Sequence, residues 1–289
     1  NLIVSSGATF DLNGFDCAID GFGGSSAGTI DNLSGSGTYT LSLGNNNAGG
    51  NHSGIIQNTS GTLAVTKVGT ATVTLSGLNT YSGKTTITQG NIAITNDANL
   101  GAAPASFVAD QLTLDNANNN GTTSYGLRCQ TASFSLSPNR GITVSANGGS
   151  VNVQNGKSVS IPGPITGPGA FWACPNWSAG YGVINLSGAN TYTGGTFIGA
   201  GTLQLGATGT LPYGTPLTIG WSNQGATTNT IFDLNGFNQT IGPLASNPGF
   251  GGTGLSVPLV KLTGALDIIE TNATTFNGTI AGVGGSLTL

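Results

Sequence analysis

Acidic side chains are the residues of this sequence that are best suited to chemistry. They form two groups, which consist of Asp11, Asp16, Asp20 and Asp31 near the start and of Asp267 and Glu270 near the end. Paired carboxylates can hydrolyse glycosidic bonds, and clustered carboxylates can bind calcium. However, Asp11 belongs to the segment FDLNGF at Phe10–Phe15, which recurs unchanged at Phe232–Phe237 and places Asp233 at the same point. Because a repeated turn favours a structural Asx-turn, we assign no catalytic residue and predict that the chain is not an enzyme.

One histidine and three cysteines are the remaining candidates for catalysis or metal binding. His52 lies in a polar, glycine-rich stretch with no evident partner, so we expect a solvated side chain. Cys17, Cys129 and Cys174 form no CxxC motif and no cluster with histidine, so we expect no metal and no cofactor. The cysteines are either three buried apolar side chains or, outside the cell, one disulfide such as Cys129–Cys174 and a third thiol.

An aromatic stretch between residues 171 and 181 interrupts the pattern of its surroundings. Within it, Trp172, Trp177 and Tyr181 are candidates for contact with a glycan or a partner, because Trp and Tyr dominate binding hot spots. The alternative is a loop that packs down on the rest of the fold.

The composition excludes several classes of protein. Of 289 residues, 6 are Lys or Arg and 10 are Asp or Glu, so 6% are charged against roughly 25% in an average domain. Six scattered cations cannot form the basic surface that nucleic acid needs. No run of 18 apolar residues exists, so we expect no membrane insertion. Gly, Thr, Asn and Ser make up half the chain, which favours strands and turns over helices.

An internal repeat is the clearest organisational feature. The segment LSGLNTYSGKTTITQGNIAI at Leu75–Ile94 matches LSGANTYTGGTFIGAGTLQL at Leu186–Leu205 in ten of twenty positions, at an offset of 111 residues. The two FDLNGF segments are 222 residues apart, which is twice that offset. We therefore divide the chain into sequence modules at 11–121, 122–232 and a partial 233–289 within one continuous domain.

Short alternating strands within each module predict a stacked all-β fold. Segments such as Thr72–Leu75 and Asn91–Ile94 alternate apolar and polar residues, and Gly, Asn and Ser punctuate them. A regular repeat favours a β-solenoid, in which each coil stacks on the last. With roughly 22 residues per coil, the chain would make about thirteen coils and a rod of about 60 Å.

The solenoid gives each residue class a position. Apolar side chains such as Val73 and Ile92 should point inward, and Tyr81 and Tyr192 should pack at corners. Outward Thr and Asn can stack in ladders without the repulsion that stacked like charges would suffer. The scarcity of charge is therefore expected.

At these residues the sequence resembles a known family. The two 20-residue copies are similar to the autotransporter-associated β-strand repeat, which occurs in passenger domains of type V secreted bacterial surface proteins. The segments around both DLNGF motifs resemble the part that usually follows it. The resemblance is specific over Val73–Leu100 and Val183–Leu211. It implies a right-handed parallel β-helix, extracellular or at the cell surface, and a repeat without catalytic residues of its own.

The ends of the chain carry strand-like residues without an evident polar cap. These residues are Asn1, Leu2, Ile3 and Val4 at the start, and Leu287, Thr288 and Leu289 at the end. Open strand edges pair with other chains, and head-to-tail contacts that do not close produce filaments. We therefore expect a structural subunit that associates with copies of itself in a bacterial surface filament, although a truncated chain would look the same. The alternative is a passenger adhesin that binds surfaces or glycans, and the third possibility is a polysaccharide-active enzyme on the same scaffold.

Overall fold

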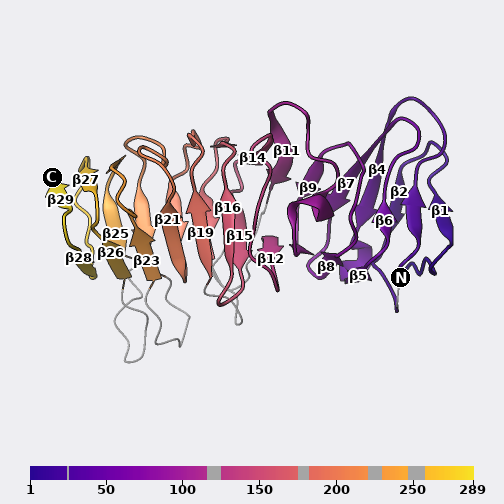
Figure 1. The fold of residues 1–289 in the computed structure, drawn as a ribbon, viewed down its shortest axis with the longest axis horizontal. Coiled ribbons are helices and arrows are strands. Elements are labelled where there is room, and N and C mark those ends of the chain that lie inside the picture. Colours follow the sequence, from indigo (N-terminus) through magenta and orange to yellow (C-terminus); the bar gives the residue numbers. More distant parts are fainter. Residues whose placement is uncertain (25, 116–124, 175–181, 221–229, 247–257) are drawn as a thin grey trace.

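Short parallel strands wind the chain into a solenoid. The computed structural model describes residues 1–24, 26–115, 125–174, 182–220, 230–246 and 258–289. In these ranges the strands are two to seven residues long and pair in parallel. The two described helices are single 3-10 turns, η1 (Asn45–Asn47) and η2 (Asp97–Leu100), and neither could cross a membrane. The strands form one elongated body with the two termini at opposite ends (Figure 1), which confirms the predicted all-β solenoid.

The strands form three faces, which we number in the order in which each turn visits them. Face 1 consists of β1 (Thr9–Asp11), β3 (Thr29–Asp31) and β6 (Ile55–Ile56), and later of β13 (Phe134–Ser135), β16 (Ser158–Ile161), β19 (Val183–Leu186), β21 (Thr202–Leu205), β23 (Thr230–Asp233), β26 (Pro258–Lys261) and β28 (Thr279–Ala281). Face 2 consists of β2 (Cys17–Ile19), β4 (Thr38–Leu43), β7 (Thr62–Lys67), β9 (Thr85–Ile87), β11 (Val108–Leu114), β14 (Arg140–Val144) and β17 (Ile165–Thr166), and later of β24 (Gln239–Ile241), β27 (Ala265–Ile268) and β29 (Ser286–Thr288). Face 3 consists of β5 (Gly50–His52), β8 (Thr72–Leu75), β10 (Asn91–Ile94), β12 (Gly126–Cys129), β15 (Gly149–Val153), β18 (Phe171–Ala173), β20 (Thr196–Ile198), β22 (Leu217–Ile219) and β25 (Leu244–Ser246).

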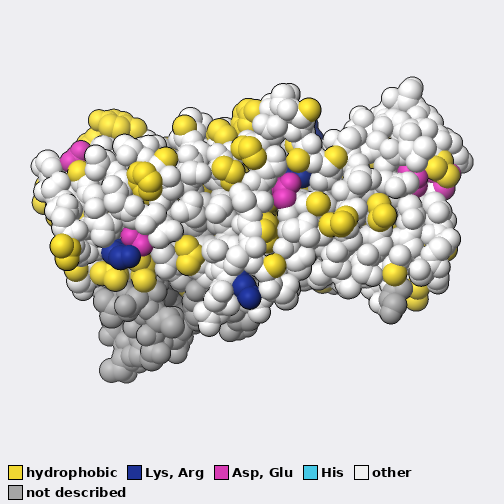
Figure 2. Space-filling view, in the orientation of Figure 1, with side chains coloured by type: hydrophobic (Ala, Val, Ile, Leu, Met, Phe, Trp, Pro, Cys, Tyr) yellow, Lys and Arg dark blue, Asp and Glu magenta, His cyan; other side chains and the backbone are white. Residues whose placement is uncertain are grey.

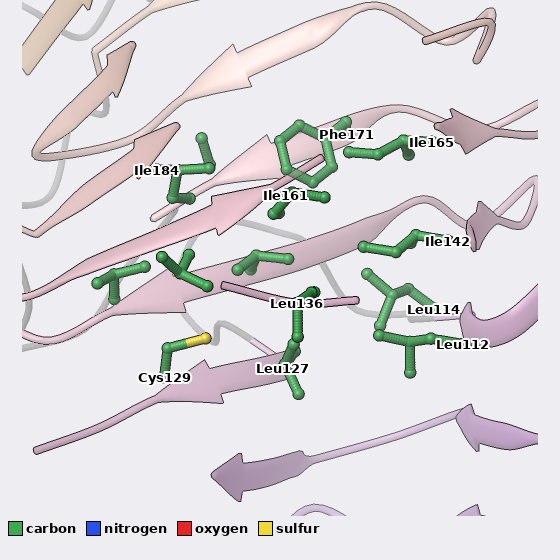
Figure 3. Close-up of a cluster of buried hydrophobic side chains, with 14 of the residues drawn as sticks. Leu112, Leu114, Leu127, Cys129, Leu136, Ile142, Ile161, Ile165, Phe171 and Ile184 are labelled. Carbon is green, nitrogen blue, oxygen red and sulfur yellow. The ribbon is translucent and has the colours of Figure 1, made fainter. Parts of the chain in front are cut away.

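In-register columns of apolar side chains fill the interior. One column on face 3 runs through Val73, Ile92, Leu127, Val151, Ala173, Ile198 and Ile219. All of its members are at most 1% exposed, and side chains from the other faces meet them in the middle of the rod (Figure 3). Full burial of one such aliphatic side chain contributes about 1.5–3 kcal/mol, so stacking supplies the main stabilisation. The predicted inward positions of Val73 and Ile92 are confirmed.

The outer side of face 2 carries the predicted ladder of hydroxyl residues. Its in-register members are Ser42, Thr66, Thr86, Thr113, Thr143 and Thr166. Neighbours in this column can hydrogen bond, as do the hydroxyls of Thr143 and Thr166 at 3.2 Å. Neutral side chains tolerate the strand spacing of about 4.8 Å, which would bring like charges into repulsive contact. Figure 2 shows few charged side chains on this side of the molecule, some of them in adjacent pairs of opposite sign.

The solenoid makes about ten turns, slightly fewer than the expected thirteen. The two copies of the repeat show why, because β8 lies on face 3 whereas its equivalent, β19, lies on face 1. Four further strands of face 3 (β10, β12, β15 and β18) separate them, so 111 residues wind through about four and one-third turns. One turn therefore takes about 26 residues instead of 22. The repeat is not a whole number of turns, and its copies point in different directions.

Candidate functional site

The repeated DLNGF segment forms the predicted Asx-turn in both copies. The Oδ1 atom of Asp11 accepts the backbone N–H of Asn13 at 2.8 Å, and Asp233 accepts that of Asn235 at 2.9 Å. Asn13 and Gly14 have φ angles of 51° and 75°, which suit the Asn-Gly dipeptide. These two carboxylates therefore shape corners of the solenoid.

The other early carboxylates connect successive turns. Asp16 accepts the backbone N–H of Thr40 at 2.8 Å, and Asp20 accepts the side-chain amide of Asn46 at 2.8 Å. Each bond joins residues on adjacent turns. Thr40 lies in β4 before the point where its pairing with β2 begins, and Asn46 lies in η1 at a corner. Asp16 and Asp20 therefore have a structural role in connecting turns.

Asp31 is the most buried carboxylate of this group. Its oxygens accept hydrogen bonds from Gln57 Nε2 at 2.6 Å and from the backbone and hydroxyl of Thr59 at 2.8 and 2.7 Å. Burial by itself raises the pKa of Asp31, but the hydrogen bonds from Gln57 and Thr59 outweigh it and leave that pKa below its ordinary value. The ionised carboxylate thus binds β3 to the chain that follows β6.

The later acidic pair is placed differently. Asp267 is exposed on β27, and Glu270 accepts the backbone N–H of Leu244 at 3.4 Å and the hydroxyl of Thr274 at 3.3 Å. Throughout the described ranges, no three His, Cys, Asp or Glu side chains gather closely enough to hold a metal ion. The early carboxylates lie on the first turns of the rod, where Asp11 and Asp31 are register partners in β1 and β3, and the later pair lies on the last turns.

His52 is buried, so the expectation of a solvated side chain is wrong. It occupies an inward position of β5, where its Nδ1 lies 3.0 Å from Ser26 Oγ and its ring stacks on Phe22 at 4.8 Å. Burial lowers the pKa of His52. Ser26 and His52 are each at most 1% exposed, so a substrate cannot reach this pair.

The cysteines are free thiols. Cys129 and Cys174 are buried and Cys17 is half-buried, which confirms the apolar interpretation for the first two. Cys129 ends β12 and Cys174 follows β18, with β15 between them. Two strand spacings of about 4.8 Å separate their backbones by about 10 Å, beyond the roughly 7 Å that a disulfide spans.

The aromatic stretch is only partly described. Trp172 projects outward from β18 and stacks on Phe197 of β20, with ring centroids 4.1 Å apart and planes 10° apart. Each ring therefore covers one face of the other, a ladder contact that also occurs in stacked sheets. Trp177 and Tyr181 lie outside the described residues. A glycan contact at this stretch stays a prediction.

Two buried asparagines fill the positions where a face lacks a strand. Asn79 accepts the backbone N–H of Ile56 at 2.8 Å and donates to the carbonyl of Asn99 at 2.6 Å. Its repeat equivalent, Asn190, accepts from Ile165 at 2.7 Å and donates to Thr210 at 2.8 Å. The side-chain amide thus replaces the missing ladder bonds between turns.

The tyrosine two residues after each asparagine is also buried and hydrogen-bonded. Tyr81 and Tyr192 are fully buried, and their hydroxyls lie 2.8 and 2.6 Å from the hydroxyls of Thr85 and Thr196. The NTY motif is therefore a structural unit of the repeat, which confirms the predicted corner packing.

Substitution Asn190→Ala should lower the free energy of unfolding by about 2–3 kcal/mol. The change leaves the N–H of Ile165 buried without a partner and removes the side-chain donor to the carbonyl of Thr210, which keeps only the backbone N–H of residue 190. The neighbouring Ala189 is exposed, so Ala189→Ser is the matched control and should change stability by less than about 0.5 kcal/mol. Urea denaturation followed by circular dichroism measures both, and equal stabilities would contradict the assigned role.

Two buried cations were not predicted from the sequence. The side chain of Arg140 is fully buried and binds Asp97 at 2.9 Å, and it also donates to the carbonyls of Leu100 and Gly101 at 2.9 Å each. Lys67 is fully buried and donates to the carbonyls of Val68 and Gly69 in the corner that follows it, and to that of Gln89 on the next turn. The only sequence signal for either residue is the rarity of charge.

The terminal residues lie at the two ends of the rod (Figure 1). Leu2 pairs with Phe22 and Val4 is buried, whereas Asn1 and Ile3 are exposed. At the other end, Leu287, Thr288 and Leu289 are exposed. An end-to-end contact through these residues stays a prediction.

These corners and ladders define a parallel β-solenoid in which one structural unit recurs. The family model described as the passenger-associated-transport-repeat matches residues 65–94 and 179–205, which contain both NTY units. The chain therefore carries two matches to this passenger-associated repeat, and the resemblance of the two segments is confirmed.

Almost the whole chain is also similar to a curated protein named as the adhesin BmaC autotransporter of Brucella suis biovar 1 (strain 1330). The two are 31% identical over 280 residues, which is 96% of this chain and 7% of the relative. The chain thus spans less than a tenth of the length of that protein. No solved structure matches this chain.

Proposed function

We propose that this chain is a β-helical section of a bacterial surface passenger that acts in adhesion. The observation that carries the proposal is the alignment of 96% of the chain with an autotransporter that is named as an adhesin. The two passenger repeats and the solenoid fold support the same class. In this role the chain is extracellular or at the cell surface and is not an enzyme.

The solenoid suits a rod that presents a surface away from the cell. Its stacked core forms one continuous hydrophobic cluster over the described residues, so bending the rod would open apolar contacts between turns. The faces are neutral and hydroxyl-rich, which suits polar contacts with a host or matrix surface. The comparisons favour this adhesin over the self-assembling filament, because the filament rests on the terminal residues alone.

Two measurements on the chain test the proposal. Antibodies against the purified chain should label intact cells of the bacterium that encodes it, and external protease should remove the label. Beads coated with the folded chain should attach to cultured host cells or matrix several-fold more than beads coated with the heat-denatured chain. Labelling only after permeabilisation, or equal attachment of both kinds of bead, would overturn the proposal.

Sedimentation of the purified chain separates the adhesin from the filament. A single rod-like species at all concentrations is expected for a passenger section. Growth into long filaments as the concentration rises would reinstate end-to-end assembly as the main function.

A further inference from the structure

A groove whose lining is mainly apolar and includes several hydroxyl groups lies on the outer side of face 2. Its volume is about 250 Å³. Side chains from four successive turns line it, and they are Thr38, Thr62, Ala64, Ser82, Lys84 and Gln111.

The groove exists because neighbouring strands of face 2 differ in length. β7 has six residues but β9 has only three, so on the side away from β4 the chain beside Thr62 and Ala64 is the corner segment 82–84 instead of a strand. On the far side, β11 carries a bulge, because its register with β14 passes from Val108 to Leu112 while β14 advances only from Arg140 to Ile142. Bulges redirect side chains and are common beside binding sites. Here the bulged segment includes Gln111, which forms one wall of the groove.

A hydrogen bond holds the Gln111 wall of the groove in place. Gln111 is 4% exposed, and its Nε2 donates to the carbonyl of Gly83 at 2.9 Å, which sets the orientation of the carboxamide. Lys84 forms an ion pair with Asp110 at the rim, and both side chains are about half exposed. Charged residues are 6% of the chain, yet two of opposite sign meet at this groove. Their charges cancel, so the groove offers polar groups without a net charge.

We propose that this groove binds one neutral sugar residue of a surface glycan. Hydroxyls of Thr38, Thr62 and Ser82 and the Lys84–Asp110 pair supply donors and acceptors to sugar hydroxyls. The methyl groups of Thr38, Thr62 and Ala64 offer apolar contacts to its C–H groups. A volume of about 250 Å³ is below the 300–1,000 Å³ of drug-sized sites, which suits a single ring. The inference rests on the proposed adhesive function for its biological partner, but sugar binding can be measured separately.

Saturation-transfer NMR of the purified chain tests the groove. The probes are the methyl glycosides of glucose, galactose, mannose and N-acetylglucosamine, with the methyl glycoside of glucuronic acid as the charged comparison. At least one neutral glycoside should bind in the millimolar range. Thr62→Val keeps the shape of the side chain but removes its hydroxyl, and Lys84→Met breaks the rim pair, so each should weaken binding about tenfold.

Thr143→Val is the matched control, because Thr143 faces outward on the same face but does not line the groove. It should leave the affinity unchanged, and circular dichroism should show all variants folded. Failure of every neutral glycoside to bind, tighter binding of the glucuronide, or an equal loss in Thr143→Val would overturn the inference. If Thr62→Val beads still attach while no glycoside binds, the groove inference fails and the adhesive function stands. If a glycoside binds but the coated beads do not attach to cells, the groove inference stands and the adhesive function fails.

Discussion

Raising the pH above about 10 should unfold this protein steeply. Two thiols and two phenols, those of Cys129, Cys174, Tyr81 and Tyr192, are at most 1% exposed. Burial raises the pKa of Cys174 from 9.0 and that of Tyr81 from 10.0, each to about 12. Burial also raises the pKa of Cys129 and that of Tyr192. The folded chain therefore keeps four protons that the unfolded chain releases.

The sign of the effect follows from this difference in proton binding. Stability from the thiols is complete below pH 9 and that from the phenols below pH 10, and both are lost as the pH rises toward the folded pKa values. Each group loses about 1.4 kcal/mol per pH unit, so the four together lose about 5 kcal/mol per unit above pH 10.

Lys67 acts in the opposite direction. Burial lowers the pKa of Lys67 from 10.5 to about 8, so the folded chain releases this proton before the unfolded chain does. Between those two pKa values, Lys67 adds up to about 3 kcal/mol to the stability as the pH rises. We therefore expect stability to stay nearly level to about pH 9 and to fall sharply above pH 10.

Two tyrosine variants make this prediction specific. Tyr192→Phe removes a buried phenol and should reduce the loss of stability above pH 10 by about 1.4 kcal/mol per pH unit. Tyr213 is 77% exposed, so Tyr213→Phe should leave the pH profile unchanged. Urea titrations at pH 8, 9, 10 and 11 give the slopes. A Tyr192→Phe slope equal to that of the original chain would show that this phenol ionises freely in the folded state.

Replacing Arg140 should cost about 3–5 kcal/mol of the free energy of unfolding. Arg140→Met leaves the carboxylate of Asp97 and the carbonyls of Leu100 and Gly101 without their shared donor. These three acceptors lie in or beside η2, which takes the place of a strand on face 1. We expect η2 to detach and face 1 to open at that turn.

An exposed ion pair provides the comparison for Arg140. Lys84 and Asp110 are about half exposed, so Lys84→Met should cost at most about 1 kcal/mol. The double variant Arg140→Met with Asp97→Leu should be more stable than Arg140→Met alone, because no unpaired carboxylate remains. Denaturant midpoints compare the four proteins, and similar losses for Arg140→Met and Lys84→Met would contradict a special role for the buried pair.

The sequence by itself determined the units from which this protein is built. The Asn-Gly corner of FDLNGF and the Asn and Tyr of the NTY motif act through local bonds and steric preferences, so equivalent residues behave alike in both copies. Alternation of apolar and polar residues set which side chains enter the core. These features predicted a parallel solenoid and the passenger repeat, both of which are confirmed.

Only the tertiary structure decided how far each turn advances and which distant residues meet. The length of a turn depends on every corner and bulge along it, so the copies of the repeat fall on different faces and the turns number about ten. His52 was expected in solvent because its neighbours are polar, but stacking against Phe22 buries it. Asp97 and Arg140, 43 residues apart, meet because the chain returns to the same corner region on a later turn. Contacts between turns depend on the accumulated winding of the chain, which no local pattern of residues specifies.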